Sequence, residues 1–182
     1  MRITGGTLRG RRLAAPKGRR VRPTSDRVKE ALFSIIGPLS GEAVLDVCAG
    51  AGSLGLEALS RGAASVVFVE KDREARRVLE ANMVALDLQS RCTVVSGAAP
   101  KALDGLRQRS SPFDLIFLDP PYASDVGERV AEAVAQGGLL APDGLLILEH
   151  DSRRPLETPA GLTRVDGRTY GGTGLLFLSL GP

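Results

Sequence analysis

Apolar residues along the chain alternate between short continuous runs and runs with helical spacing. The continuous runs predict strands over residues 43–48, 65–70, 92–96, 113–119, 145–149, 162–166 and 175–180. Spacings of three and four predict helices over residues 53–61, 72–86, 99–109 and 125–136, and an earlier helix that starts at residues 24–26 and ends at Gly37-Pro38. Strands separated by helices are typical of parallel sheets with right-handed crossovers. The pattern predicts an α/β fold with a Rossmann-like, doubly wound, mostly parallel seven-stranded sheet, whose last two strands form an antiparallel edge.

The first 23 residues differ from the rest, being rich in Gly, Arg and Pro with few apolar anchors (Ile3, Leu8 and Leu13). They predict a short basic arm or hairpin over residues 1–23, followed by a single domain over residues 24–182. The first 30 residues hold ten Lys or Arg and two acids, whereas the remainder holds fourteen bases and nineteen acids. A basic arm on a mildly acidic body favours a polyanionic partner.

A glycine loop follows the first predicted strand. Gly50, Gly52 and Gly55 fit the G-x-G-x-x-G pattern between a strand and a helix. Such glycines allow a tight turn and close approach of a ligand, and the helix start offers N–H groups to an anion. Glu70 ends the next strand, where a carboxylate can accept hydrogen bonds from two ribose hydroxyls. A dinucleotide and S-adenosylmethionine both present such a ribose.

Asp46 favours the second of these cofactors. It is an acid inside an otherwise apolar strand, which is costly unless the acid is paired. A carboxylate there would repel a pyrophosphate and attract the ammonium and sulfonium groups of S-adenosylmethionine, although it could instead cap the loop or pair with an arginine. The predicted cofactor-binding set comprises Asp46, Ala49, Gly50, Gly52, Gly55, Glu70 and Lys71.

The fourth strand ends in Asp119-Pro120-Pro121-Tyr122, our predicted catalytic segment. Two prolines stiffen this turn and leave carbonyl groups without local N–H partners. An exocyclic amine of a base is a poor nucleophile, and the Asp119 side chain and the Pro120 carbonyl could each accept one of its N–H groups. Asp119 could also receive the proton that the amine loses, and Tyr122 could stack on the base.

The remaining candidate residues predict no metal site. Cys48 and Cys92 fall in predicted strands without metal-ligand spacing, so we expect buried residues that stay reduced. His150 has no second His or Cys nearby, so we expect it to be neither a ligand nor a catalyst. No apolar run is long enough to cross a bilayer and the N-terminus lacks the apolar segment of a signal peptide, so we expect a cytoplasmic protein that contacts no membrane.

Together these segments resemble the bacterial 16S rRNA guanine-N2 methyltransferases that act on guanine 966 of the small subunit. The similarity spans nearly the whole chain and is carried by residues 1–6, 9–11, 22–33, 50–55, 57–63, 119–122 and 170–173. It implies the fold of a class I S-adenosylmethionine-dependent methyltransferase, S-adenosylmethionine as cofactor, and small-subunit rRNA, in a ribosomal particle, as partner. One departure is the segment Ser96-Gly97-Ala98-Ala99, where related methyltransferases often carry an acid near the adenine amine.

Basic residues near the start of the chain are the predicted RNA contacts. The set comprises Arg9, Arg11, Arg22, Thr24, Arg27 and Lys29. Three alternatives stay open at this point. The glycine loop and Glu70 alone would fit a nicotinamide-dependent oxidoreductase, the basic arm alone would fit a non-catalytic RNA-binding assembly factor, and Asp-Pro-Pro-Tyr would also serve adenine-N6 or DNA amines.

Overall fold

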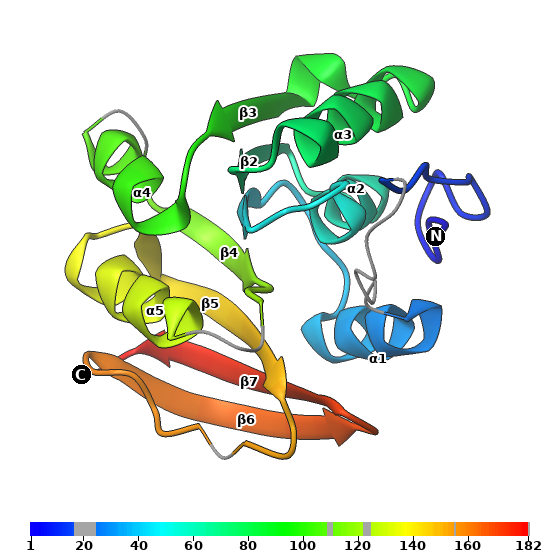
Figure 1. Cartoon of the computed structure of the whole chain (residues 1–182). Coiled ribbons are helices and arrows are strands. Elements are labelled where there is room, and N and C mark those ends of the chain that lie inside the picture. The colour runs from blue at the N-terminus through cyan, green and yellow to red at the C-terminus, as the bar shows by residue number, and fades with distance from the viewer. Residues whose placement is uncertain (17–24, 109–110, 122–124, 155, 182) are drawn as a thin grey trace.

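A computed structural model describes residues 1–16, 25–108, 111–121, 125–154 and 156–181. Its centre is one seven-stranded sheet with the order β3-β2-β1-β4-β5-β7-β6 (Figure 1). The strands are β1 Ala43–Val47, β2 Ser65–Glu70, β3 Cys92–Ser96, β4 Phe113–Leu118, β5 Leu140–Asp151, β6 Leu162–Tyr170 and β7 Thr173–Leu180. The first five strands are parallel, whereas β7 runs antiparallel to β5 and to β6. The predicted doubly wound sheet with an antiparallel edge is confirmed.

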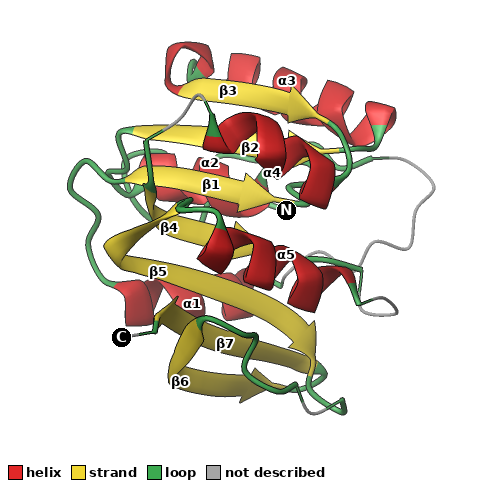
Figure 2. Cartoon of the chain, turned by 90° about the vertical axis from the view of Figure 1, so that its left-hand side faces the viewer, coloured by secondary structure: helices red, strands yellow, loops and turns green. Residues whose placement is uncertain are grey.

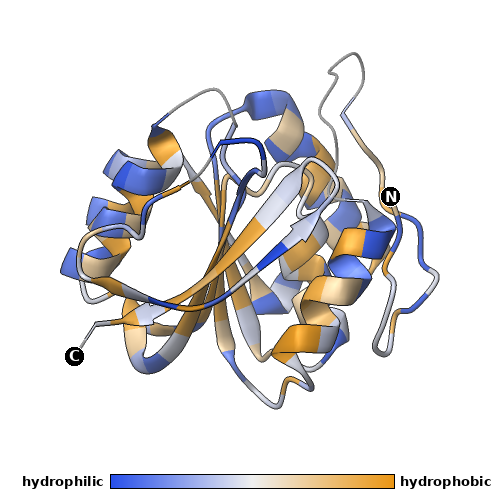
Figure 3. Ribbon diagram, turned by 90° about the horizontal axis from the view of Figure 1, so that it is seen from below, coloured by the Kyte–Doolittle hydropathy of each residue, from blue (hydrophilic) through white to orange (hydrophobic). Residues whose placement is uncertain are grey.

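Helices cover both faces of the sheet (Figures 1 and 2). The helices are α1 Asp26–Ile36, α2 Ser53–Ser60, α3 Arg73–Ala85, α4 Ala99–Arg107 and α5 Val126–Gln136, with a short 3₁₀ turn at Gln89–Arg91. Two apolar cores result, one beneath α1, α2 and α3 and the other beneath α4 and α5. In Figure 3 the hydrophobic positions line the sheet and the inward helix faces. None of the described helices is long and apolar enough to span a membrane.

The strand order reverses between β1 and β4, which are parallel neighbours. Val47 lies opposite Leu118 at their carboxyl ends, and the Asp119 N–H donates to the Val47 carbonyl at 3.4 Å. Ligands of doubly wound folds bind outside the carboxyl ends of the strands at such a reversal. The fold therefore places the glycine loop, which follows β1, beside the Asp119 turn, which follows β4.

The N-terminal residues form the predicted hairpin, which is part of the core. The Ile3 N–H donates to the Arg11 carbonyl at 2.9 Å, and the Gly10 N–H donates to the Ile3 carbonyl at 2.9 Å. Ile3 and Leu13 are buried with residues of α1, α2 and α3. The hairpin is thus docked on the domain, and residues 17–23 of the predicted arm lie outside the described residues.

Helix α1 begins as predicted, and its buried face agrees in part with the predicted one. The Ser25 hydroxyl caps it by accepting from the Val28 N–H, and Gly37 ends it. The helical spacing of apolar residues predicts Val28, Leu32 and Ile35 on the buried side; Val28 and Leu32 are buried, but 39% of the Ile35 surface is exposed. Lys29 and Phe33 are buried as well. The buried face therefore extends to Lys29, which has an ionic partner in the interior.

The last three strands are longer than predicted. Strand β5 starts at Leu140 instead of 145, and β6 continues to Tyr170. The added segments are polar or contain Pro142 and Gly144, so they do not form apolar runs. Backbone pairing with β4 and β7 extends them, which a hydropathy pattern does not detect.

Gly55, the third glycine of the loop motif, allows α2 to pack directly on β2. A Cβ there would lie 2.4 Å from Cε1 of Phe68, which is too close for any real contact. Gly55→Ala should therefore lower the free energy of unfolding by about 1–3 kcal/mol, measured by urea denaturation. Gly105→Ala in α4 is the control: its Cβ would have nothing within 4 Å, so a gain of about 0.5–1 kcal/mol is expected. Equal effects of the two changes would contradict this packing.

Candidate active site

Three strand ends bring the predicted cofactor and catalytic residues around one point. The Gly50 N–H donates to Oε2 of Glu70 at 2.8 Å, which joins the loop after β1 to the end of β2. The thiol of Cys48, which follows β1, is affected by the carboxylates around it. Burial and then the negative charges of Glu70, Asp119 and Asp46 raise the pKa of its thiol to about 12. Since β2 and β4 flank β1, Asp46, Glu70 and Asp119 lie on three adjacent strand ends at the reversal of strand order.

Cys48 itself corrects a prediction. It lies in the turn after β1 rather than in the strand, with a left-handed φ of 62° and a partly exposed surface. Cys92 does open β3, but it is also only partly buried. Both are free cysteines. The predicted strand position is confirmed for Cys92 and wrong for Cys48, because the tight turn begins one residue earlier than the apolar run suggests. Neither cysteine is as deeply buried as expected.

The glycine loop leaves space on one side. Gly50 and Gly52 have φ values of 56° and 82°, a region that side chains strongly disfavour. At Gly52 a Cβ would be 2.3 Å from Cδ1 of Leu79, so that glycine serves packing. At Gly50 a Cβ would have nothing within 4 Å, beside the carboxylate of Glu70. The open side of the loop is where a nucleoside can approach the backbone.

Glu70 is buried and held by two backbone groups. Its Oε2 accepts from Gly50 and its Oε1 accepts from the Asp72 N–H, both at 2.8 Å. Each carboxylate oxygen has a second lone pair, so the group can still accept two hydroxyls. These two remaining acceptor positions fit the hydroxyl donors of the ribose of an adenosine cofactor. Lys71 follows with an exposed side chain.

The buried side chain of Asp46 is hydrogen-bonded to the helix start that follows the glycine loop. It is 2% exposed, and its Oδ2 accepts from the Gly55 N–H at 2.9 Å, in the first turn of α2. The loop-capping alternative is therefore realised, and the same carboxylate lies under the glycine loop. Burial first, partly offset by the Gly55 hydrogen bond, and then the charge of Glu70 raise the pKa of Asp46 to about 7.

This raised pKa predicts a pH dependence of stability. Between about pH 4 and pH 7 the folded protein keeps a proton on Asp46 that the unfolded chain releases, so folding is favoured as the pH falls. The stabilising contribution is lost as the pH rises through 7. Asp46→Asn, which keeps an acceptor for Gly55, should flatten the stability profile over this window, measured by urea denaturation at several pH values. Identical slopes for the wild type and Asp46→Asn would contradict the raised pKa.

The predicted catalytic segment begins directly after β4. Asp119 is half-buried, Pro120 is buried and Pro121 is exposed, while Tyr122 lies outside the described residues. Gly127 at the start of α5 allows the helix to pack closely on Pro120, because a Cβ there would lie 3.0 Å from Cγ of Pro120. The segment thus packs between the cofactor loop and α5.

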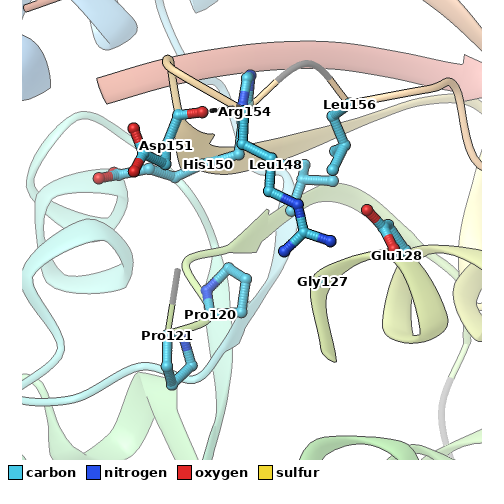
Figure 4. A pocket seen from close by; sticks show the side chains of 10 residues that line it. Pro120, Pro121, Gly127, Glu128, Leu148, His150, Asp151, Arg154 and Leu156 are labelled. Atoms are coloured by element: carbon cyan, nitrogen blue, oxygen red, sulfur yellow. Dashed lines mark hydrogen bonds between the residues drawn. The ribbon is translucent and has the colours of Figure 1, made fainter. Parts of the chain in front are cut away.

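A hollow opens on the other side of the prolines, with about 360 Å³ of empty space that is partly open to solvent (Figure 4). It is lined by Pro120, Pro121, Gly127, Glu128, Leu148, Glu149, His150, Asp151, Arg154 and Leu156. Leu118 of β4 lies opposite Leu148 of β5, so the residues that follow Leu118 lie beside the last residues of β5. Asp119 therefore lies between the cofactor loop and this hollow.

Residues from β5 and α5 in this hollow were missed by the sequence analysis. His150 lines it, although we expected no role for this residue, and its ring lies over Gly174, where a Cβ would be 2.3 Å from Nε2. Glu128 and Arg154 also line it. No motif marks them, because the β4–β5 register and the packing of α5 on Pro120 bring them to the hollow.

The predicted RNA contacts divide into three groups. Arg9, Arg11 and Arg27 are exposed, with Arg11 also donating to the Ala85 carbonyl at 2.7 Å. Arg22 and Thr24 lie outside the described residues. Lys29 is fully buried, which contradicts its predicted contact with RNA.

Lys29 is part of a buried ionic cluster that fastens the hairpin to α1 and α2. Its Nζ lies 3.3 Å from Oε2 of Glu57 and donates to the Arg2 carbonyl at 2.6 Å and to Oγ of Ser53 at 3.2 Å. Glu57 also accepts from Thr4, Gly5 and Arg61. Burial alone would raise the pKa of Glu57, but the Thr4 backbone, Arg61 and Lys29 together lower it. Glu57 is the one acid among the apolar residues of α2, and this is the sequence feature that could have indicated a buried ionic cluster.

Two further sequence observations concern the segment after β3 and possible metal ligands. Helix α4 starts at the departure from the family pattern, with Ala98 as an N-cap that makes no side-chain hydrogen bond. Within the described residues, no group of three or more His, Cys, Asp or Glu is placed to hold a metal ion.

Similarity to known proteins covers almost the entire chain. A family model described as "Conserved hypothetical protein 95" matches residues 1–179. "Ribosomal RNA small subunit methyltransferase D" of Haemophilus influenzae is 37% identical over 174 residues, which are 94% of this chain and 89% of that protein. The Escherichia coli K12 protein of the same name is 37% identical, over 87% of this chain and 78% of its own.

A solved structure is similar over nearly the whole chain. The Escherichia coli structure titled "Putative methyltransferase yhhF" has a TM-score of 0.85 and 33% identity, and the match covers 99% of this chain and 97% of that one. The seven-stranded sheet with its glycine loop is the fold of class I S-adenosylmethionine-dependent methyltransferases. The chain therefore belongs to the family described as conserved hypothetical protein 95, among relatives named ribosomal RNA small subunit methyltransferase D.

Proposed function

We propose that this protein transfers a methyl group from S-adenosylmethionine to the exocyclic N2 amine of a guanine in small-subunit rRNA. The single observation that carries the proposal is the position of Asp119, between the Gly50–Glu70 loop and the hollow beside Pro120. The names of the relatives support rRNA as the substrate class. The resemblance of residues 22–33 and 119–122 to the guanine-N2 enzymes supports guanine 966 as the target and a ribosomal particle as its context.

The described residues fit the cofactor. Glu70 would accept the ribose hydroxyls, Asp46 lies beneath the loop where it favours a cationic amino-acid moiety, and Ala49, Gly50, Gly52, Gly55 and Lys71 complete the predicted set. When bound, S-adenosylmethionine supplies an electrophilic methyl group. Backbone groups after β3 would contact the adenine, because no acid stands at residues 96–99.

The chain's own residues would orient the amine. Asp119 and the Pro120 carbonyl accept its two N–H groups, which turns the nitrogen lone pair away from the ring and toward the cofactor loop. The amine loses one proton as it is methylated, and the Asp119 carboxylate accepts it. On sequence grounds, we propose Tyr122 as the residue that stacks on the base. Positioning of two bound reactants accounts for most of the remaining rate gain.

RNA binding would rest on the exposed cations of the hairpin and α1. Arg9, Arg11 and Arg27 are available to phosphates, and Arg22 and Thr24 remain in the proposal on sequence grounds. Lys29 is not part of the proposed RNA-binding set, because its side chain is buried. Binding through phosphates should weaken steeply with added salt.

Methyl transfer to small-subunit particles tests this proposal. Particles from cells that lack the protein are incubated with it and with cofactor carrying a labelled methyl group, and the labelled nucleoside is then identified. N2-methylguanosine at one position is the expected product. Label in adenine would replace guanine as the target, and no label in any RNA would refute the proposal.

A further inference from the structure

Two neighbouring arginines follow β5, and the turn gives them different surroundings. The Arg154 N–H donates to the Asp151 carbonyl at 3.0 Å, which closes the turn. Arg153 is tied to the Asp151 side chain, with its Nε 2.9 Å from Oδ1 and its Nη2 2.6 Å from Oδ2. Only Arg154 lines the hollow beside the catalytic segment. The turn therefore occupies one guanidinium and leaves the other over the hollow.

The Arg154 guanidinium reaches into the middle of the hollow, between Pro120 and Glu128 in Figure 4. Among the described residues it makes no hydrogen bond or ion pair through its side chain. Leu148, Leu156 and Pro120 supply apolar walls around it. An unpaired fork of N–H donors in such a setting suits a flat ligand that carries adjacent acceptors on one edge.

A guanine whose N2 amine is bound at Asp119 would be such a ligand, flat and with adjacent acceptors on one edge. Its O6 and N7 acceptors lie on the part of the purine ring remote from N2, which extends away from Asp119 into the hollow. Bidentate contact of arginine with O6 and N7 is the commonest specific contact to guanine. Adenine presents an amine donor in place of O6, which a guanidinium cannot satisfy.

We propose that Arg154 is a specificity-determining residue that binds the O6 and N7 edge of the target guanine while N2 lies at Asp119. This inference rests on the proposed function and deepens it by naming the residue that selects guanine. Arg153 carries the same charge one position away but is held by Asp151, so it serves as a matched control.

The test uses the full-length protein and an RNA substrate that the wild type methylates, with either guanosine or 2-aminopurine at the methylated position. 2-Aminopurine keeps the amine but lacks O6. With guanosine, Arg154→Ala should lower kcat/KM by about 10- to 100-fold, as expected for loss of one bidentate contact, and Arg154→Lys should fall between. Arg153→Ala should stay close to the wild type. With 2-aminopurine, the wild type should already be slow, and Arg154→Ala should add little further loss.

Two results would overturn the inference while leaving the proposed function intact. Equal losses for Arg154→Ala and Arg153→Ala would indicate only general attraction to phosphate. Equal losses for guanosine and 2-aminopurine in Arg154→Ala would show that the side chain does not contact O6. Absence of RNA methylation by the wild type would instead refute the proposed function, and the inference with it. The cofactor affinity and thermal midpoint of each variant confirm that the exposed substitution leaves the fold unchanged.

Discussion

Asp119→Ala should lower kcat for methyl transfer by about 100- to 10,000-fold, the range typical for loss of a positioned acid–base group. The side chain lies at the reversal of strand order, beside Cys48 and next to the hollow that we assign to the base. Its removal takes away one acceptor for the amine and the acceptor of the released proton. Single-turnover methylation of small-subunit particles measures the loss.

Cofactor binding distinguishes this role from a structural one. Glu70 and the glycine loop remain in Asp119→Ala, so the affinity for S-adenosylhomocysteine, measured by calorimetry, should stay close to that of the wild type. Asp143→Ala is the matched control, since that acid is exposed in the first half of β5, near the opposite end of the sheet. Wild-type turnover in Asp119→Ala would refute the assigned role.

Lys29→Met should lower the free energy of unfolding by about 3–5 kcal/mol, because it leaves a buried carboxylate without its buried cation. Lys29 and Glu57 are both fully buried, with 3.3 Å between Nζ and Oε2. The Arg2 carbonyl and the Ser53 hydroxyl would also lose a donor. Urea denaturation at neutral pH measures the change.

Lys101→Met in α4 is the control for this prediction, because Lys101 is exposed. It should shift stability by no more than about 0.5 kcal/mol. If Lys29 instead contacts RNA, Lys29→Met would keep wild-type stability and weaken RNA binding, which would contradict the buried cluster. Loss of stability with unchanged salt dependence of RNA binding is the expected pattern.

Much of the fold follows from hydropathy because its central strands are buried on both faces. The runs that end at Val47, Glu70 and Leu118 are apolar enough to mark β1, β2 and β4 within a residue of their observed ends. Parallel strands end at the same edge, so the glycine loop, Glu70 and Asp119 could be placed together from sequence alone.

Features that depend on tertiary pairing could not be predicted in this way. Lys29 looked like a surface cation of α1, because nothing in its neighbourhood identifies Glu57, 28 residues later, as its partner. Arg154 carries no motif, and only the β4–β5 register and the Asp151 turn bring it over the hollow. Local patterns thus indicate which elements form, whereas long-range contacts decide what each polar side chain does.

A crystal structure of the protein with S-adenosylhomocysteine would test the central claim most directly. We predict that the ribose lies on Glu70, that the open side of Gly50 faces the nucleoside, and that the sulfur atom faces the Asp119 carboxylate across one cleft. A ligand bound away from the ends of β1 and β4, with its sulfur remote from Asp119, would contradict the account.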